Sequence, residues 1–306
     1  MDERIVCRIL TGPTASGKSD WGLRMAEEQG WVIVCMDSMQ IYRGMDIGTA
    51  KPTPEERRRV RHELLDICEP TDAFSVAAYR DRAEALIREL WEKEGKEALF
   101  VGGTGLYMQA LIHPMDMGGT EADPALRAEL RTMAETAEGR RALHAQLAGM
   151  DPETAERLPV NDVRRIIRAI EVTKATGIPF SRQRSREGTS PFAWKIAAVR
   201  MPREQLYDRI NRRVTKMIDS GLAEEVRGLM AAGVPEDAQS MSGIGYKEMI
   251  PCIRGEYSLE EAADRIRLNT RHYAKRQMTF LRREPEVKYI DADEAGAYEA
   301  LTQTLA

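Results

Sequence analysis

The chain has 306 residues and carries 45 Lys and Arg against 49 Asp and Glu, so its formal net charge is −4. With 42% hydrophobic and 31% charged residues, it has the composition of a globular protein of about two domains and is too apolar for a disordered chain. The longest apolar run, residues 31–36, is far shorter than the roughly 20 residues of a membrane span, which excludes a membrane-spanning helix. Four dispersed cysteines and four dispersed histidines exclude a disulfide framework and a structural zinc site, and they predict a cytoplasmic location.

The first third of the chain predicts strands that alternate with helices. Buried strands are expected at residues 4–10, 31–36, 62–67 and 97–101. A helix is expected at residues 75–94, with Ser75 as its N-cap and Gly95 as its terminator. Such alternation is typical of parallel βαβ units, in which ligands bind beyond the carboxyl ends of the strands.

The middle of the chain has a different pattern. A linker-like stretch, residues 115–124, is followed by helical patterns at residues 124–137, 140–148, 152–158 and 162–176, without a convincing strand. Strand character returns at residues 194–199 and 287–290, and helices are expected at residues 203–220, 222–232 and 259–278. We therefore expect a core formed by residues 1–114 and 192–306, with an all-helical insertion domain at residues 115–191.

The strongest motif directly follows the first strand. It is a complete G-x-x-x-x-G-K-S phosphate loop made of Gly12, Pro13, Thr14, Ala15, Ser16, Gly17, Lys18 and Ser19. In such a loop the backbone N–H groups and the following helix N-terminus hold an anion, the lysine contacts phosphate oxygens, and the serine hydroxyl binds Mg²⁺. The fold class predicted is therefore α/β, with a P-loop NTPase-like parallel sheet core and the helical insertion.

A phosphate loop does not identify its phosphate. Nucleotide hydrolysis or kinase action is the default, but no [NT]-K-x-D motif follows, and the strand at residues 97–101 ends in Gly-Gly-Thr where many ATPases have a metal-binding Asp. Asp37 is the acidic residue at a strand end near the loop, so it is a candidate Mg²⁺ ligand or general base. The polar segment that follows, Ser38, Met39 and Gln40, is suited to reading a base edge, with an ordinary polar loop as the alternative.

Two basic patches predict a polyanionic partner. Residues 157–186 carry eight basic and two acidic side chains, and residues 265–283 carry seven basic and no acidic ones. Asn161, Arg164, Arg165 and Arg168 share one helix face, as do Arg267, Arg271, Lys275 and Arg282. Solvated helix faces are the alternative interpretation. Tyr273 and Phe280, on the opposite side of the last long helix, are expected to be core residues, with platforms for base stacking as the alternative.

Seven segments together resemble one family, the tRNA dimethylallyltransferases. They are GPTASGKS, DSMQIYRGMDIGTAKP, GGTGLYMQAL, TGIPFS, GLAEEV, GYKE and TRHYAKRQ, in chain order from Gly12 to Gln277. The chain lacks the C-terminal zinc finger of the eukaryotic members and so resembles the bacterial form.

The resemblance implies that a dimethylallyl group is transferred from dimethylallyl diphosphate to the exocyclic N6 amine of the adenosine 3′ to the tRNA anticodon. The phosphate loop, with Lys18 and a Mg²⁺ ion on Ser19, would then stabilise the departing diphosphate. Asp37 is the candidate base, and Thr104 is implied to lie at the reaction centre. Arg209 and Arg213 are weaker candidates for a diphosphate clamp, with an exposed, salt-bridged helix face as the alternative.

The same resemblance implies which residues contact the tRNA anticodon stem-loop. They are Asp37, Ser38, Met39, Gln40, Asn161, Asp162, Val163, Arg164, Arg165, Arg168, Arg271 and Lys275. The helical insertion would contribute to this surface, and a monomer is expected. A rival from another class is an RNA-binding P-loop ATPase or GTPase module, and a small-molecule P-loop kinase would leave both basic patches unexplained.

Overall fold

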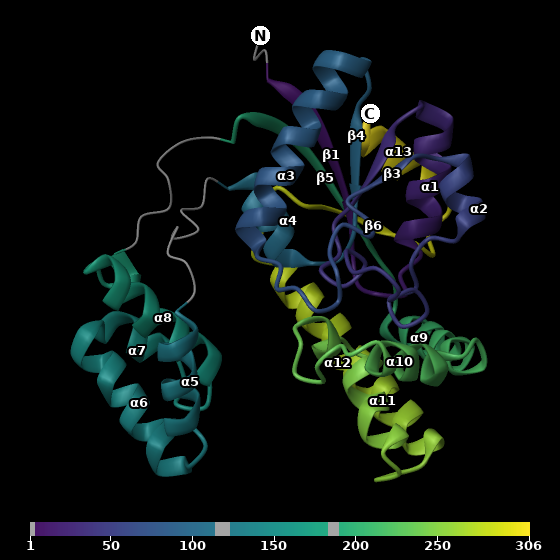
Figure 1. Cartoon of the computed structure of the whole chain (residues 1–306). Helices are drawn as coiled ribbons and strands as arrows, with labels where there is room; N and C mark the ends of the chain where they lie inside the picture. Colours follow the sequence, from purple (N-terminus) through teal and green to yellow (C-terminus); the bar gives the residue numbers. More distant parts are fainter. Residues whose placement is uncertain (1–3, 114–122, 183–189) are drawn as a thin grey trace. The chain divides into compact units, whose positions relative to one another are not determined.

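A computed structural model of the chain describes residues 4–113, 123–182 and 190–306. It divides into two compact units, one formed by Met1–His113 with Ser190–Ala306 and the other by Pro114–Thr189 (Figure 1). Within the described residues, no helix has the length and apolar character needed to cross a membrane. The linker predicted at residues 115–124 lies outside the described residues except for its last two positions.

The larger unit is built on a parallel sheet of six strands. They are β1 (Ile5–Thr11), β2 (Val32–Cys35), β3 (His62–Glu63), β4 (Ala98–Val101), β5 (Phe192–Arg200) and β6 (Lys288–Asp291). Their order across the sheet is β3-β2-β4-β1-β5-β6. β1 is central, because Ile9 pairs with Phe100 of β4 on one side and with Ile196 of β5 on the other. The expected α/β class is confirmed.

Helices cover both faces of this sheet, which is why its strands are continuous apolar runs. On one face, Val34 and Phe100 pack in a cluster with residues of α3 (Val76–Glu89) and α4 (Gly105–Ile112). On the other face, Ile33 and Leu99 pack with residues of α1 (Lys18–Gln29) and α13 (Ala297–Leu305). The side chains that alternate along each strand therefore belong to two apolar clusters, one on each face of the sheet.

The larger unit contains further helical elements besides those that cover the sheet. They are α2 (Pro54–Arg59), the π-helical turn η1 (Leu90–Glu94), α9 (Arg203–Asp219), α10 (Leu222–Ala231), the 3₁₀ turn η3 (Ser240–Ser242), α11 (Tyr246–Ile253) and α12 (Leu259–Leu281). Ser75 caps α3 by accepting the Ala78 N–H at 3.1 Å, and Gly95, with a φ of 61°, ends the continuation through η1. Both predicted caps are confirmed.

The predicted strand at residues 62–67 is wrong beyond its first two residues. Leu64 and Asp66 adopt positive φ values of 57° and 54°, which no strand allows. The Asp66 carboxylate is held by Lys51 Nζ at 2.6 Å and by Arg57 Nη1 at 2.7 Å. These two ion pairs fix Asp66 in a loop conformation that the local sequence pattern does not reveal.

The second unit is helical throughout its described residues. Its elements are α5 (Pro124–Met133), α6 (Ala137–Met150), α7 (Pro152–Arg157), α8 (Val163–Thr176) and the 3₁₀ turn η2 (Phe180–Arg182). Leu130, Leu143, Leu147, Ile166 and Ile170 form its core. Thr136 caps α6 by accepting the Gly139 N–H at 2.9 Å, so this helix begins earlier than predicted.

Three strand ends in the larger unit lie side by side at one edge of the sheet. The Met36 N–H donates to the Val101 carbonyl at 2.9 Å, and the Gly102 N–H donates to the Leu10 carbonyl at 3.2 Å. The segments that follow β1, β2 and β4 therefore meet at a single edge. In parallel sheets this edge is where ligands bind.

Candidate active site

The phosphate loop connects the end of β1 to the first turn of α1. Gly12, Ala15 and Gly17 have positive φ values of 138°, 64° and 91°. A side chain at Gly12 would come within 2.4 Å of the Val199 carbonyl oxygen, so the close approach to β5 requires glycine there. The loop thus leads directly into the N-terminus of α1, whose dipole attracts anions.

Lys18 begins α1 and lies against the loop. Its Nζ donates to the Pro13 carbonyl at 3.2 Å, and the same carbonyl accepts the Ser16 N–H at 3.2 Å. Desolvation, reinforced by the positive charge of Arg213 and opposed by the negative charge of Asp37, lowers the pKa of Lys18 to about 8. The ammonium group therefore lies in a site that lacks sufficient negative charge, which an anionic ligand would supply.

A pocket of about 170 Å³ opens in front of this loop. Its lining combines loop and α1 residues with two arginines of α9, namely Ala15, Gly17, Lys18, Ser19, Asp20, Arg209 and Arg213. Arg209 lies over Gly17, since a Cβ there would be 3.1 Å from the arginine Nη2. Arg213 is held by the Thr49 carbonyl at 3.3 Å, and desolvation lowers its pKa. Sequence analysis left these arginines undecided, and the structure brings both to the phosphate loop.

Asp37 directly follows β2 and starts the next loop. Its Oδ1 accepts the N–H groups of Met39 at 2.8 Å and Gln40 at 3.4 Å. Its Oδ2 accepts no hydrogen bond from the described residues. The negative charge of Asp37 partly opposes the lowering of the pKa values of Lys18 and Arg213. This carboxylate therefore lies within electrostatic reach of the phosphate pocket.

Thr104 stands at the start of α4, beside Asp37. Its Oγ1 accepts the Ser38 N–H at 3.0 Å and donates to the Ser38 Oγ at 3.5 Å, while the Thr104 N–H donates to the Met36 carbonyl at 3.2 Å. A Cβ at Gly102 would be 2.1 Å from the Met36 carbonyl oxygen, so glycine is required where the two strand ends approach. Thr104 is thus fixed next to the loop that carries Asp37.

Two residues of α12 complete the site, and sequence analysis missed both. The Gln277 side chain accepts the Thr14 N–H at 2.8 Å and donates to the Gly103 carbonyl at 2.8 Å, so it bridges the two glycine-rich turns. Tyr273 is hydrogen-bonded to Thr104 and Gln277, and burial together with the charge of Asp37 raises its pKa. Tyr273 is partly buried, as expected of a residue on the inner face of α12, but its hydroxyl faces these polar groups, which the sequence analysis did not foresee. The four-residue spacing within TRHYAKRQ was the available signal.

The polar side chains that follow Asp37 make most of their hydrogen bonds within their own loop. The Gln40 amide donates to the carbonyls of Thr49 and Ala50 at 3.1 and 3.3 Å, and its Oε1 accepts from the Cys35 thiol at 3.5 Å. Met39 extends toward Gly243, where a Cβ would lie 3.0 Å from its sulfur. In this structure the Gln40 amide shapes the loop, and the half-buried Ser38 and Met39 flank it.

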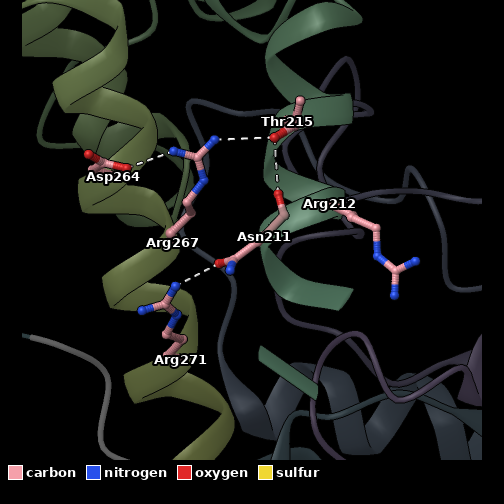
Figure 2. A pocket seen from close by; sticks show the side chains of 6 residues that line it. All are labelled: Asn211, Arg212, Thr215, Asp264, Arg267 and Arg271. Atoms are coloured by element: carbon pink, nitrogen blue, oxygen red, sulfur yellow. Dashed lines mark hydrogen bonds and ion pairs between the residues drawn. The ribbon is translucent and has the colours of Figure 1, made fainter. Parts of the chain in front are cut away.

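The basic patch of α12 borders a second, open pocket of about 550 Å³ between α9 and α12. Figure 2 shows Arg267 and Arg271 extending toward Asn211 and Thr215, whereas Arg212 points away from them. Arg271 donates to the Asn211 Oδ1 at 2.7 Å, and Arg267 donates to Asp264 at 2.7 Å. Lys275, farther along α12, is exposed.

The basic patch of α8 belongs to the helical unit. Arg164 and Arg165 are exposed there, as is Asn161, while Asp162 and Val163 are half-buried where the helix begins. Arg165 also lies 3.5 Å from Asp162.

Arg168 of the same patch differs, because it pairs at 2.9 Å with Glu171, a buried carboxylate that also binds Arg127 at 2.8 Å. These hydrogen bonds outweigh the effect of burial and lower the pKa of Glu171. Arg168 is thus a structural partner within its unit. Two further arginines of the patch, Arg184 and Arg186, lie outside the described residues.

The fold and the site define a P-loop protein in which two arginines of α9 line a pocket together with the phosphate loop. A family model described as IPP transferase matches residues 40–284. The chain is 46% identical to a tRNA dimethylallyltransferase of Pelotomaculum thermopropionicum over 97% of its length and 94% of the relative. It is 44% identical to one of Geobacter metallireducens, over 99% and 97% of the two chains.

A solved structure agrees with these sequence comparisons. The full-length tRNA isopentenylpyrophosphate transferase of Bacillus halodurans superposes with a TM-score of 0.72 at 39% identity, covering 99% of this chain and 97% of that one. The chain belongs to the IPP transferase family. The resemblance drawn from the seven segments is confirmed.

Proposed function

We propose that this protein transfers a dimethylallyl group from dimethylallyl diphosphate to the N6 amine of the adenosine 3′ to the anticodon in tRNA, releasing diphosphate. One observation carries the proposal beyond family membership. The cationic pocket formed by Lys18, Arg209 and Arg213 adjoins a loop whose Asp37 carboxylate acts on two of those cations. An anion site and a carboxylate in this proximity suit a reaction in which an anion departs and an amine loses a proton.

The phosphate loop holds the leaving group. As the allylic C–O bond breaks, negative charge grows on the diphosphate, and the cations of the pocket stabilise that charge. This is a use of the loop in which no nucleotide is hydrolysed. Because no described residue gives Lys18 an anionic partner in direct contact, the diphosphate would be the group that fulfils this role.

Asp37 is proposed as the base and Thr104 as its neighbour at the acceptor. The lone pair of an adenine amine is delocalised into the ring, so loss of its proton during C–N bond formation should accelerate the step by about 10²–10⁴. The proton would pass to the Asp37 Oδ2, which accepts no hydrogen bond from the described residues. The Thr104 hydroxyl accepts a hydrogen bond from the Ser38 N–H, and it can orient the adenine ring of the acceptor beside Asp37.

A Mg²⁺ ion fits the donor set. Mg²⁺ at phosphate sites takes one or two protein oxygens and completes its shell with phosphate and water. Ser19 and Asp20 offer a hydroxyl and a carboxylate at the pocket. No group of three metal-binding side chains occurs in the part of the chain that the structure describes, so the diphosphate would have to contribute. A Mg²⁺ ion held by Ser19 would supply charge neutralisation of the diphosphate when bound.

The acceptor proposed is the anticodon stem-loop of tRNA in the cytoplasm, bound by a monomer. The exposed cations Arg164, Arg165 and Lys275 can contact backbone phosphates, which position an RNA without reading its sequence. The target adenosine has to leave the base stack to reach Asp37, and this costs least for a loop base.

The test is direct. The protein is incubated with Mg²⁺, dimethylallyl diphosphate and an unmodified tRNA transcript, and nucleoside mass spectrometry is expected to find a gain of about 68 Da on one adenosine, the mass of the C₅ group less a proton. A transcript with guanosine at that position is the matched control and should gain nothing. RNA-stimulated ATP hydrolysis without the mass gain would favour the rival RNA-binding ATPase.

A further inference from the structure

Two segments that carry the family resemblance have no part in the reaction as proposed. They are GLAEEV, at the start of α10, and GYKE, at the start of α11. Neither segment lines the phosphate pocket. Both nevertheless converge on the loop that runs from Asp37 to Pro52.

The carboxylate of Glu225, in GLAEEV, holds three consecutive backbone groups of that loop. Its Oε2 accepts the N–H groups of Asp46 at 2.9 Å and Ile47 at 2.7 Å, and its Oε1 accepts the Gly48 N–H at 3.1 Å. Hydrogen bonds to a carboxylate are about twice as strong as those between neutral groups. The neighbouring Glu224 behaves as an ordinary surface residue, because it is exposed and paired with Arg227.

Tyr246, in GYKE, closes the same contact. Its hydroxyl donates to the Glu225 Oε1 at 2.6 Å, and the tyrosine is fully buried. A Cβ at Gly48 would lie 2.5 Å from the Tyr246 ring, so this loop position admits only glycine. Burial and the adjacent carboxylate raise the pKa of Tyr246, which keeps its hydroxyl a donor.

The clamped stretch carries a carbonyl that serves both halves of the site. The Thr49 carbonyl, one residue beyond Gly48, accepts from Arg213 at 3.3 Å and from Gln40 at 3.1 Å. Arg213 lines the phosphate pocket, and Gln40 belongs to the turn capped by Asp37. A displacement of the Thr49 peptide would therefore move both Arg213, at the phosphate pocket, and the turn that contains Asp37 and Gln40.

We propose that Glu225 is a positioning residue that fixes the Thr49 peptide and thereby preorganises Arg213 for the diphosphate and the Asp37–Gln40 turn for the acceptor base. The inference rests on the proposed function. Glu225 does not line the phosphate pocket, and it acts through the loop that it holds.

The first test compares Glu225→Gln with Glu224→Gln, which changes the same charge one residue away. An amide can accept through only one of its two ends, so Glu225→Gln loses part of the clamp while keeping its size. We expect kcat for dimethylallyl transfer to fall about 10- to 100-fold, the effect of a small misplacement of reacting groups. Affinity for inorganic diphosphate, measured by calorimetry without RNA, should fall several-fold. Glu225→Asp, which keeps the charge, should recover part of both losses.

The second test asks whether the effect passes through Arg213. In an Arg213→Ala background, Glu225→Gln should reduce diphosphate affinity much less than in the wild type, because the group that it positions is gone. A purely structural residue would lower the midpoint of thermal unfolding and would act equally in both backgrounds. Should Glu225→Gln fail to fold, Tyr246→Phe removes one bond from the same carboxylate and should show the same coupling.

The inference would be overturned if Glu225→Gln had the same kcat and diphosphate affinity as Glu224→Gln. It would also be overturned if Glu225→Gln lowered diphosphate affinity as much in the Arg213→Ala background as in the wild type. If the wild-type protein transfers no dimethylallyl group to tRNA, the proposed function fails. The diphosphate measurements need no RNA, so they still decide the role of Glu225.

Discussion

The ammonium group of Lys18 should make diphosphate binding strongly dependent on pH. Desolvation and the charge of Arg213 bring its pKa from an ordinary 10.5 down to about 8 in the ligand-free protein. A bound diphosphate places negative charge beside the lysine and raises its pKa again. Since the protonated form binds the anion more tightly, affinity is complete below pH 8 and is lost as pH rises through the pKa of the free protein.

The size of the effect follows from that pKa. About nine-tenths of the free protein carries a charged Lys18 at pH 7 and about one-tenth at pH 9. If the lysine stays charged in the complex, affinity for dimethylallyl diphosphate should therefore fall about tenfold over this range, or about 1.4 kcal/mol. At pH 8, where about half of the free protein is uncharged at this position, binding should take up about half a proton.

Isothermal titration calorimetry without tRNA measures both quantities. Affinities are compared at pH 7, 8 and 9, and proton uptake at pH 8 follows from the observed heats in buffers of different ionisation enthalpy. Lys18→Arg is the matched variant, because its guanidinium stays charged throughout and the ionisation of the ligand cancels in the comparison. Equal pH profiles for the two proteins, or binding without proton uptake at pH 8, would refute the reasoning.

Four substitutions test the remaining assignments. Asp37→Ala should lower the single-turnover rate a hundredfold or more with tRNA affinity nearly unchanged, and a loss of diphosphate binding instead would make Asp37 a ligand. Arg164→Ala should reduce the slope of log affinity for tRNA against log salt by about one, and an unchanged slope would return this residue to the solvated helix face. Arg168→Ala should lower the free energy of unfolding by about 1–3 kcal/mol in chemical denaturation, because it deprives Glu171 of a partner, whereas a stability equal to the wild type contradicts that role. Tyr273→Phe should reduce kcat several-fold at unchanged diphosphate affinity in steady-state assays, and an unaltered kcat would leave its hydroxyl without a part in the reaction.

The parts of the fold that local pattern determines could be predicted from the sequence. The phosphate loop, its strand and the capped helix α3 each depend on neighbouring residues: the glycines of the turn, an apolar run, and Ser75 at an N-terminus. The helices α4, α11 and α13 escaped prediction. They are eight or nine residues long, and two of them, α11 and α13, have glycine at the N-cap, so they lack the length and the capping side chains that make a pattern evident.

The parts of the site that depend on tertiary contact were less accessible. Periodicity places Tyr273 and Gln277 on one face of α12, but it cannot distinguish a face that enters a core from one that meets two glycine-rich turns. Charge counting likewise treats Arg164 and Arg168 alike, although only the second meets a buried glutamate. Clamping by Glu225 requires loop backbone from 177 to 179 residues away in the chain, a contact that the local pattern of α10 does not show.

The bridge made by Gln277 has a consequence for biosynthesis. The phosphate loop leaves the ribosome well before α12, yet its Thr14 N–H is hydrogen-bonded to a side chain 263 residues later in the chain. The strand before the loop, β1, also pairs with β5, which is synthesised much later. A nascent chain stopped short of α12 would carry the whole phosphate-binding motif without an assembled catalytic edge, so premature termination should yield fragments that cannot consume the prenyl donor.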